Sequence, residues 1–320
     1  MSGHLDVVAS IVDFLALSVQ VRELRLLAMN VFVTGATGFV GSAIVRELLD
    51  AGHQVTGLAR SDANAEALSR AGASVHRGAL DDLDSLRAGA RAADGVIHCA
   101  FPTNTFDFAV SSAVDAKAIG ALGEALVGTQ RPLVVSSVLG FLAPGRLATE
   151  DTARPPNALP RVSEETALAF APRGVRAMAV RLAPATHDTG VQGFVKALVR
   201  IAREHGAASY IGDGSNVWPA IHRRDAARLY RLALERGEAG RNYHATAEQG
   251  VPLRQLMQTI AHGLGVPATS LTPQAAAAYF GGLLPFAAMD CPASSTQTRA
   301  ALDWEPQEIG LIEETTRATL

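Results

Sequence analysis

The sequence predicts an α/β protein whose strands form a doubly wound parallel sheet, followed by a smaller C-terminal lobe. An apolar, β-branched run over residues 30–34 leads into three glycines spaced three apart, Gly35, Gly38 and Gly41. A helix-period pattern starts directly after Gly41. Strand-like and helix-like segments then alternate to about residue 182, which is the order expected of a parallel sheet covered by helices.

The three glycines predict a turn that binds the pyrophosphate of a dinucleotide. Gly35 permits the sharp turn, Gly38 lets the backbone approach the phosphates, and Gly41 allows the new helix to pack against the strand. The N–H groups and the positive dipole end of that helix then face the phosphates. The expected contacts are Gly35, Thr37, Gly38, Phe39, Val40 and Gly41.

The other elements of the sheet follow in order along the chain. Strands are expected at residues 53–60, 73–78, 94–100, 132–137 and 175–182. Helices are expected at 42–49, 62–70, from Asp81 onward, at 110–127 and at 161–171, and the acidic residues in the first turn of the third suit the helix dipole. The proline-rich stretch 143–160 is expected to form a loop at the C-terminal edge of the strands, where ligands bind in such sheets.

Beyond residue 182 the regular alternation fails. Helical patterns at 193–204, 224–236, 253–264 and 273–278 come with only brief strand candidates, such as 242–245. We therefore expect an NAD(P)-binding core over residues 29–182 and a substrate lobe over 183–320, with short returns to the core near 216–245. Residues 1–28 read as a dispensable extension, because Met29 stands directly before the first strand.

Composition favours a small-molecule ligand. The 320-residue chain is 48% apolar and carries a net charge of −3 with a pI near 6.3. That balance gives no electrostatic reason to expect nucleic acid or an anionic membrane as partner. The two cysteines, Cys99 and Cys291, lack metal or redox spacing and are typical of reduced thiols in a cytoplasmic protein. The histidines His187, His222 and His244 show no ligand spacing, so no metal is expected.

Six ordered segments resemble the short-chain dehydrogenases/reductases of the extended type, also called the NAD-dependent epimerase/dehydratase family. The segments are Thr34-Gly-Ala-Thr-Gly-Phe-Val-Gly41, Val96-Ile-His-Cys-Ala100, Val134-Val-Ser-Ser137, Val180-Arg-Leu-Ala-Pro184, Ile221-His-Arg-Arg-Asp225 and the stretch from Ser294 to Pro306. The resemblance implies a Rossmann-type sheet with a smaller C-terminal substrate lobe. It also allows a homodimer, because long helices often pair between subunits in this family.

The chain departs from the resembled family at its catalytic pair. The family uses Tyr-x-x-x-Lys, in which the tyrosine exchanges a proton with the substrate and the lysine lowers the tyrosine pKa. None of the four tyrosines here has a lysine four residues on, and the chain has only two lysines, Lys117 and Lys196. Aligning the segment after residue 159 with the family motif puts Pro160 at the tyrosine and Glu164 at the lysine. The chain is therefore interpreted as an atypical member of the family.

Cofactor preference is read from the end of the second strand. NAD-selective members carry an acidic residue there, whereas this chain has Ala59 followed by Arg60 and Ser61, which suit a 2′-phosphate. NADP is preferred, and Asp62 keeps NAD open. By resemblance, Asp81 could meet the adenine, and Ala100 and Ser136 end strands beside the cofactor.

Four residues are candidates for catalysis. By resemblance, Ser137 occupies the serine position that orients the substrate, and His187 follows a segment that lines the substrate pocket. Glu164 and Arg161 face the site by alignment. We expect an NADP(H)-linked oxidoreductase with a non-standard proton donor and a small, unidentified substrate. The alternatives are an NADP-sensing regulator without turnover and a sugar-nucleotide epimerase or dehydratase, the latter disfavoured because its chemistry also needs the missing tyrosine.

Overall fold

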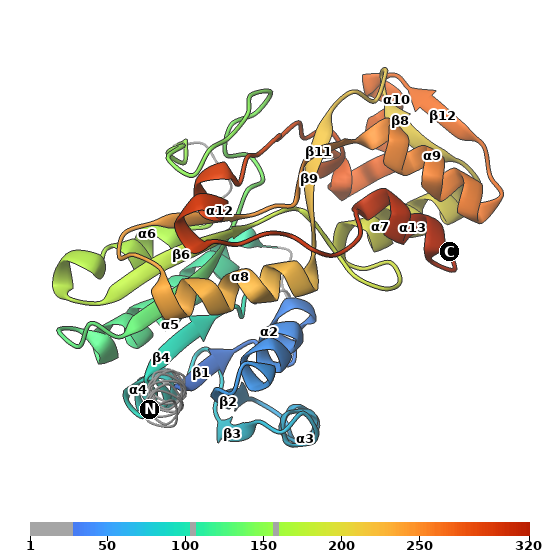
Figure 1. Cartoon of the computed structure of the whole chain (residues 1–320). Coiled ribbons are helices and arrows are strands. Elements are labelled where there is room, and N and C mark those ends of the chain that lie inside the picture. The colour runs from blue at the N-terminus through green and yellow to red at the C-terminus, as the bar shows by residue number, and fades with distance from the viewer. Residues whose placement is uncertain (1–27, 103–106, 156–159) are drawn as a thin grey trace, which may run out of the picture.

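The computed structural model describes residues 28–102, 107–155 and 160–320 (Figure 1). The expected dispensable extension lies outside the described residues, except for Ala28. Part of the expected loop 143–160 also lies outside them. Among the described residues, no helix has the length and apolar character needed to cross a bilayer.

A seven-stranded sheet forms the centre of the larger lobe, and all of its strand pairs are parallel. Its strands run in the spatial order β10-β6-β5-β4-β1-β2-β3. The strands are β1 (Asn30–Thr34), β2 (Gln54–Ala59), β3 (Ser74–Arg77), β4 (Gly95–His98), β5 (Pro132–Val138), β6 (Arg176–Leu182) and β10 (Asn242–Ala245). The order reverses between β1 and β4, so the ligand crevice of such a sheet is expected beyond the carboxyl ends of these two strands.

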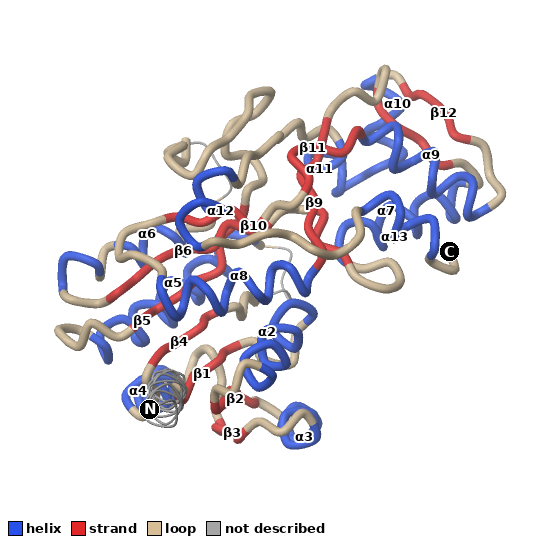
Figure 2. The backbone as a smooth tube through the Cα atoms, in the orientation of Figure 1, coloured by secondary structure: helices blue, strands red, loops and turns tan. Residues whose placement is uncertain are grey.

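Helices cover both faces of this sheet (Figure 2). On one face lie α2 (Phe39–Asp50), α3 (Asp62–Arg70) and α8 (Arg223–Arg236). On the other lie α4 (Leu83–Arg91), α5 (Phe108–Leu126) and α6 (Ser163–Leu168). Strand side chains alternate between the two cores, as Val134 and Val135 of β5 illustrate. The Rossmann-type doubly wound fold predicted from the sequence is confirmed.

The chain after β6 builds a second lobe beside the sheet (Figure 1). This lobe has its own hydrophobic core and two small sheets, ordered β11-β9-β7 and β12-β8. Its elements are β7 (Ala185–His187), α7 (Gly193–His205), β8 (Ala208–Ile211), β9 (Val217–His222), β11 (Glu248–Pro252), α9 (Leu253–Leu264), β12 (Ala268–Leu271), α10 (Pro273–Phe280), α11 (Leu284–Ala287) and α13 (Leu311–Arg317). Between them, α8 and β10 return to the larger lobe, where α12 (Thr296–Leu302) also packs.

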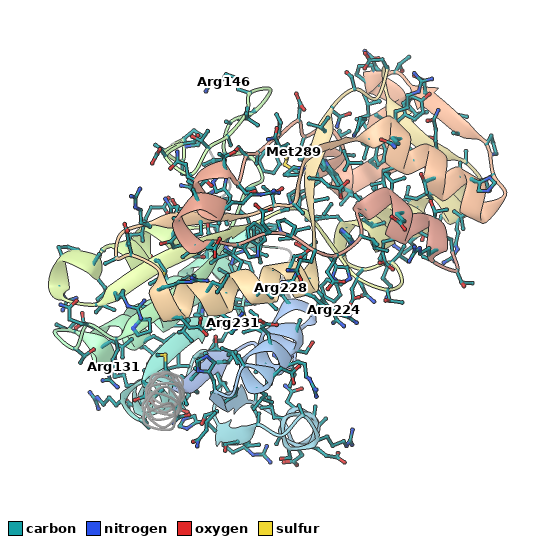
Figure 3. All side chains as sticks on the ribbon, in the orientation of Figure 1. Arg131, Arg146, Arg224, Arg228, Arg231 and Met289 are labelled. Carbon is teal, nitrogen blue, oxygen red and sulfur yellow. The ribbon has the colours of Figure 1, made fainter. Side chains whose placement is uncertain are left out.

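An ion pair ties α8 to α2, the helix that follows the glycine turn. Arg231 donates to Glu47 of α2 at 2.7 Å and to Glu235 of its own helix at 3.0 Å. Figure 3 shows Arg231 in a row with Arg224 and Arg228 along α8.

The fully buried Asp225 at the start of α8 accepts hydrogen bonds from the backbone N–H groups of Gln307 and Glu308. Contacts between residues far apart in sequence therefore hold α8 against α2 and against the segment at residues 307–308.

Three expected boundaries were wrong. The first helix begins at Phe39 rather than after Gly41, so Gly41 lies inside it. The third helix begins at Leu83, with Asp82 capping it through a bond to the N–H of Ser85, so Asp81 precedes the helix. The expected helix 161–171 is shorter, because α6 ends at Leu168 and a separate 3₁₀ turn follows at Ala171–Arg173. Proline at the second position of that turn suits the start of a new helical segment rather than the interior of an old one.

Candidate functional site

The glycine turn after β1 is built so tightly that it excludes side chains. Gly35 has φ +69°, and a Cβ on it would lie 2.6 Å from the backbone nitrogen of Ala100. A Cβ on Gly41 would lie 2.0 Å from the carbonyl oxygen of Gly35. Both substitutions would therefore push atoms well inside van der Waals contact. The turn is pressed against the end of β4, and α2 is pressed against the turn.

The start of α2 offers unpaired donors. Gly38 is its N-cap, and no side chain caps the helix. Gly38 itself donates to the carbonyl of Gly35 at 2.9 Å, but among the described residues no acceptor bonds the N–H groups of Phe39, Val40 and Gly41. Gly38 is exposed, and the one atom near its missing Cβ is the Gly35 oxygen at 3.1 Å. These donors and the space beside them fit a phosphate group.

A cavity of about 410 Å³ opens at the carboxyl ends of β4, β5 and β6, between the two lobes. It begins beside the glycine turn, because Phe101 lines it and is one residue beyond Ala100. The polar side chains among its described lining residues are Arg161, Ser111 and Thr186. The remaining lining residues are Phe101, Pro102, Phe108, Val138, Gly140, Phe141, Leu182, Ala183, Pro184, Phe194, Phe286 and Met289.

Arg161 is the cation of this cavity. Its guanidinium stacks on the ring of Phe101 at 4.3 Å, and Nη2 donates to the carbonyl oxygen of Ser136 at 3.0 Å. Nε donates to the hydroxyl of Ser163 at 2.9 Å. Burial lowers the pKa of Arg161, and the charge of Asp115 opposes that shift. The group still carries its charge at neutral pH, because an arginine does not lose its proton in proteins.

A buried chain of polar groups supports Arg161 from below. Ser163 donates to Asp115 of α5, and Asp115 also accepts a hydrogen bond from Nε2 of His98 at 2.9 Å. Nδ1 of His98 lies 2.8 Å from the hydroxyl of Thr34, directly before Gly35. His98 and Asp115 are 1% and 0% exposed. This network of hydrogen bonds thus links the glycine turn to Arg161 in the cavity. Sequence reasoning missed it, although an aspartate within the apolar helix 110–127 was a usable signal.

The paired serines at the end of β5 do not line this cavity. Successive strand residues face opposite sides of a sheet, so the two hydroxyls diverge. The Ser136 hydroxyl lies 2.6 Å from that of Tyr230 on α8, in the core. Ser137 is 1% exposed, donates to Glu164 at 3.3 Å and accepts from Arg154 at 3.1 Å. The predicted substrate contact of Ser137 and the predicted cofactor contact of the Ser136 hydroxyl therefore find no support.

Glu164 does not line the apolar cavity, where the alignment was expected to place it. It forms a bidentate pair with the buried Arg181, at 2.6 and 2.8 Å, and lines a second, charged cavity of about 510 Å³ with Arg154. Burial opposes the ionisation of Glu164, but the hydrogen bonds and charge of Arg181 and the charge of Arg154 hold its pKa below the ordinary value. Glu164 is therefore an ion-pair anchor between α6 and β6, and of the two aligned candidates only Arg161 faces the apolar cavity.

His187 also falls outside the apolar cavity. Its neighbour Thr186 lines that cavity, whereas His187 points the other way and packs edge-to-face on His222 at 5.4 Å. Burial, with the charge of His222, lowers its pKa to about 4, and neither ring nitrogen has a hydrogen-bond partner among the described residues. This position does not support the predicted proton transfer. The described residues also contain no group of three or more potential metal ligands.

Cationic side chains gather at the ends of β2 and β3. Arg60 is exposed directly after β2, and Arg77 ends β3 in register with Ala59. Arg77 donates to Asp62 at 2.7 Å, so the acidic residue that follows Ser61 is already paired. The hydroxyl of Ser61 caps α3 by accepting from the N–H of Asn64 at 3.3 Å. Asp81 is exposed nearby, beyond β3.

Comparisons with known proteins agree with the fold. The model of the NAD dependent epimerase/dehydratase family matches residues 31–127. The uncharacterised protein C2A9.02 of Schizosaccharomyces pombe is 45% identical, over 89% of this chain and 97% of its own length. The decarboxylating sterol-4-alpha-carboxylate 3-dehydrogenase of Dictyostelium discoideum is 27% identical, over 71% and 74%. Among solved structures, the dTDP-glucose 4,6-dehydratase DesIV of Streptomyces venezuelae, with NAD bound, superposes with a TM-score of 0.72 at 20% identity, over 91% and 96%.

The buried pair of Glu164 and Arg181 should contribute to the free energy of unfolding. Glu164→Gln leaves a buried guanidinium without its counter-charge, so urea unfolding at pH 7 should show a loss of about 3 kcal/mol. Because the folded-state pKa of Glu164 is lowered, its contribution is present above the ordinary glutamate pKa and is lost as pH falls through the folded value. The variant should therefore lose less additional stability on acidification below about pH 5 than the wild type does.

The matched control for this measurement is Glu313→Gln, which breaks an exposed pair with Arg317 on α13. It should change the free energy of unfolding by less than about 1 kcal/mol at either pH. Equal effects of the two substitutions would contradict the role assigned to Glu164.

Proposed function

The chain belongs to the NAD-dependent epimerase/dehydratase family, and from that premise we propose that it is an NADP(H)-linked oxidoreductase acting on a small, largely apolar substrate. In the direction of reduction, a carbonyl carbon would receive hydride and its oxygen a proton, which gives an alcohol and the oxidised dinucleotide. The family contains NAD(P)-dependent dehydrogenases, reductases and dehydratases. The name of the Dictyostelium relative, a 3-dehydrogenase, supports an oxidation or reduction at a carbon–oxygen centre.

One observation carries the proposal: a phosphate cradle and an apolar cavity adjoin at the same strand ends. The N–H groups of Phe39, Val40 and Gly41 would hold the pyrophosphate, and Gly38 leaves room for it. Gly35 rests on Ala100, and the next residue, Phe101, begins the cavity. A bound nicotinamide dinucleotide would supply or accept the hydride.

The chain's own groups then bind the substrate and exclude water. Phenylalanine rings from both lobes line the cavity, and a dry site strengthens each electrostatic interaction inside it. The guanidinium of Arg161 is the charge available to a substrate oxygen. Tyrosine, lysine and histidine are missing from the lining residues that the structure describes. Catalysis here would therefore depend on a proton donor other than the family tyrosine.

The arginines beyond β2 and β3 favour NADP over NAD. Arg60 is exposed with no hydrogen-bond partner among the described residues, and Arg77 adds a second guanidinium in the neighbouring strand. Asp62, the acid that kept NAD open, is paired with Arg77. Guanidinium groups bind a phosphate through strong charge-assisted hydrogen bonds, which a ribose 2′-hydroxyl does not provide.

Cofactor choice is tested by titrating NADPH and NADH into wild type and Arg60→Ala. The variant should bind NADPH at least about tenfold more weakly, because a charge-assisted bond is lost, and NADH affinity should hardly change. Arg70→Ala, which removes an exposed arginine from α3 nearby, is the matched control and should leave both affinities intact. Equal losses for the two nucleotides in Arg60→Ala would remove Arg60 from the 2′-phosphate site.

Turnover is tested by following NADPH oxidation with a panel of aldehydes, ketones and apolar oxo acids. At least one member should be reduced, with substrate-dependent consumption of NADPH. If NADPH binds tightly and no member is turned over, the missing Tyr-x-x-x-Lys pair favours the second candidate, an NADP-sensing regulator. A sugar-nucleotide substrate is disfavoured, because three polar side chains among the described lining residues offer few partners for its hydroxyl groups.

A further inference from the structure

The apolar cavity is lined mainly by aromatic side chains. Five phenylalanine rings line it, and they form a continuous cluster through Phe286, whose ring centroid lies 4.7 Å from that of Phe194 and 5.7 Å from that of Phe141. Phe108 joins Phe286 to Phe101 at centroid distances of 6.4 Å each. A wall of this kind binds the hydrocarbon or aromatic part of a ligand and gains little from a hydroxylated one.

Arg161 supplies the opposite chemistry at one side of the same cavity. Of the five N–H donors of an arginine, the hydrogen bonds to Ser163 and Ser136 use two, which leaves three on Nη1 and Nη2. Stacking on Phe101 covers a face of the guanidinium and leaves its edge for hydrogen bonding. The lining residues that the structure describes include no aspartate or glutamate. The terminal fork is therefore available to an anion from the ligand.

The guanidinium is also held in a fixed place. Ser163 receives the Nε hydrogen bond and passes one to Asp115, which is fully buried and bonded to His98. Asp115 balances the charge of Arg161 from behind without reaching the cavity. A cation that is anchored on one side and open on the other binds a planar anion with little loss of side-chain freedom.

We propose that Arg161 binds the carboxylate of an apolar carboxylic acid whose hydrocarbon or aromatic body fills the phenylalanine-lined cavity. This inference rests on the proposed function and names its substrate class. The planar fork of an arginine matches both oxygens of a carboxylate. It is a poor proton donor, which argues against the reacting oxygen as its partner. The volume of about 410 Å³ is at the small end of ligand sites and suits a monocyclic or short branched acid.

Binding is measured by calorimetry on the full chain with saturating NADP⁺, and again without nucleotide. The probes are phenylacetate, 3-phenylpropanoate and 4-phenylbutanoate, each paired with its neutral carboxamide. At least one acid should bind at least about tenfold more tightly than its amide, the low end for a charge-assisted bond. Arg161→Met should abolish this preference and Arg161→Lys should retain part of it. Arg146→Met, which removes an exposed arginine that is not among the residues lining the cavity, should leave it unchanged.

Several outcomes would overturn the proposal. They are equal affinity of acid and amide, survival of the preference in a folded Arg161→Met protein, and failure of all three acids to bind at millimolar concentration. Melting curves establish whether each variant is folded. If Arg161→Met does not fold, Arg161→Lys provides the test, because it should retain only part of the preference for the acid. Because the nucleotide-free titration does not depend on NADP, loss of carboxylate recognition is distinguished from failure of the dinucleotide function.

Discussion

The contact between the backbone of the glycine turn and the first turn of α2 is the constraint on which the rest of the site depends. With no side chain at Gly41, the helix rests on the carbonyl of Gly35, and with none at Gly35 the turn rests on Ala100 at the end of β4. Each close approach fixes the next element along. These contacts therefore join the start of α2, the switch point between β1 and β4, and the cavity that begins at Phe101.

Some polar groups at the strand ends are buried in structural hydrogen bonds, and others face the cavity. The buried groups bond within the protein. The Ser136 hydroxyl bonds that of Tyr230, and Ser137 bonds Glu164. Glu164 is also paired with Arg181. Arg161 faces the cavity and is held from behind through Ser163 and Asp115. A sequence in which no tyrosine is followed by a lysine four residues on thus places an anchored cation in an aromatic cavity. The arrangement favours recognition of an anionic, apolar substrate over the hydroxyl-rich substrates of sugar-nucleotide enzymes.

The sequence predicted the larger lobe well, because its signals are local. Glycine spacing identified the turn, and the alternation of apolar runs with helical periods identified the six strands from β1 to β6. The short strands β7, β8, β9, β11 and β12 were missed, because three to six residues carry too little periodicity to register. Family alignment brought Arg161, Glu164 and Ser137 to one site, but it could not tell which way each side chain points. That depends on strand alternation at Ser136 and Ser137 and on the partners Arg181 and Asp115, which are distant in sequence.

The most direct test of this account is the affinity of Gly38→Ala for NADPH. Gly38 has ordinary backbone angles, and its added methyl group would lie 3.1 Å from the Gly35 oxygen, a tight contact that a small shift relieves, so the protein should still fold. The methyl group would occupy the space that the phosphates need. NADPH affinity, measured by calorimetry, should fall at least about tenfold, as expected when charge-assisted bonds to a phosphate are broken. Unchanged affinity in the folded variant would contradict this account.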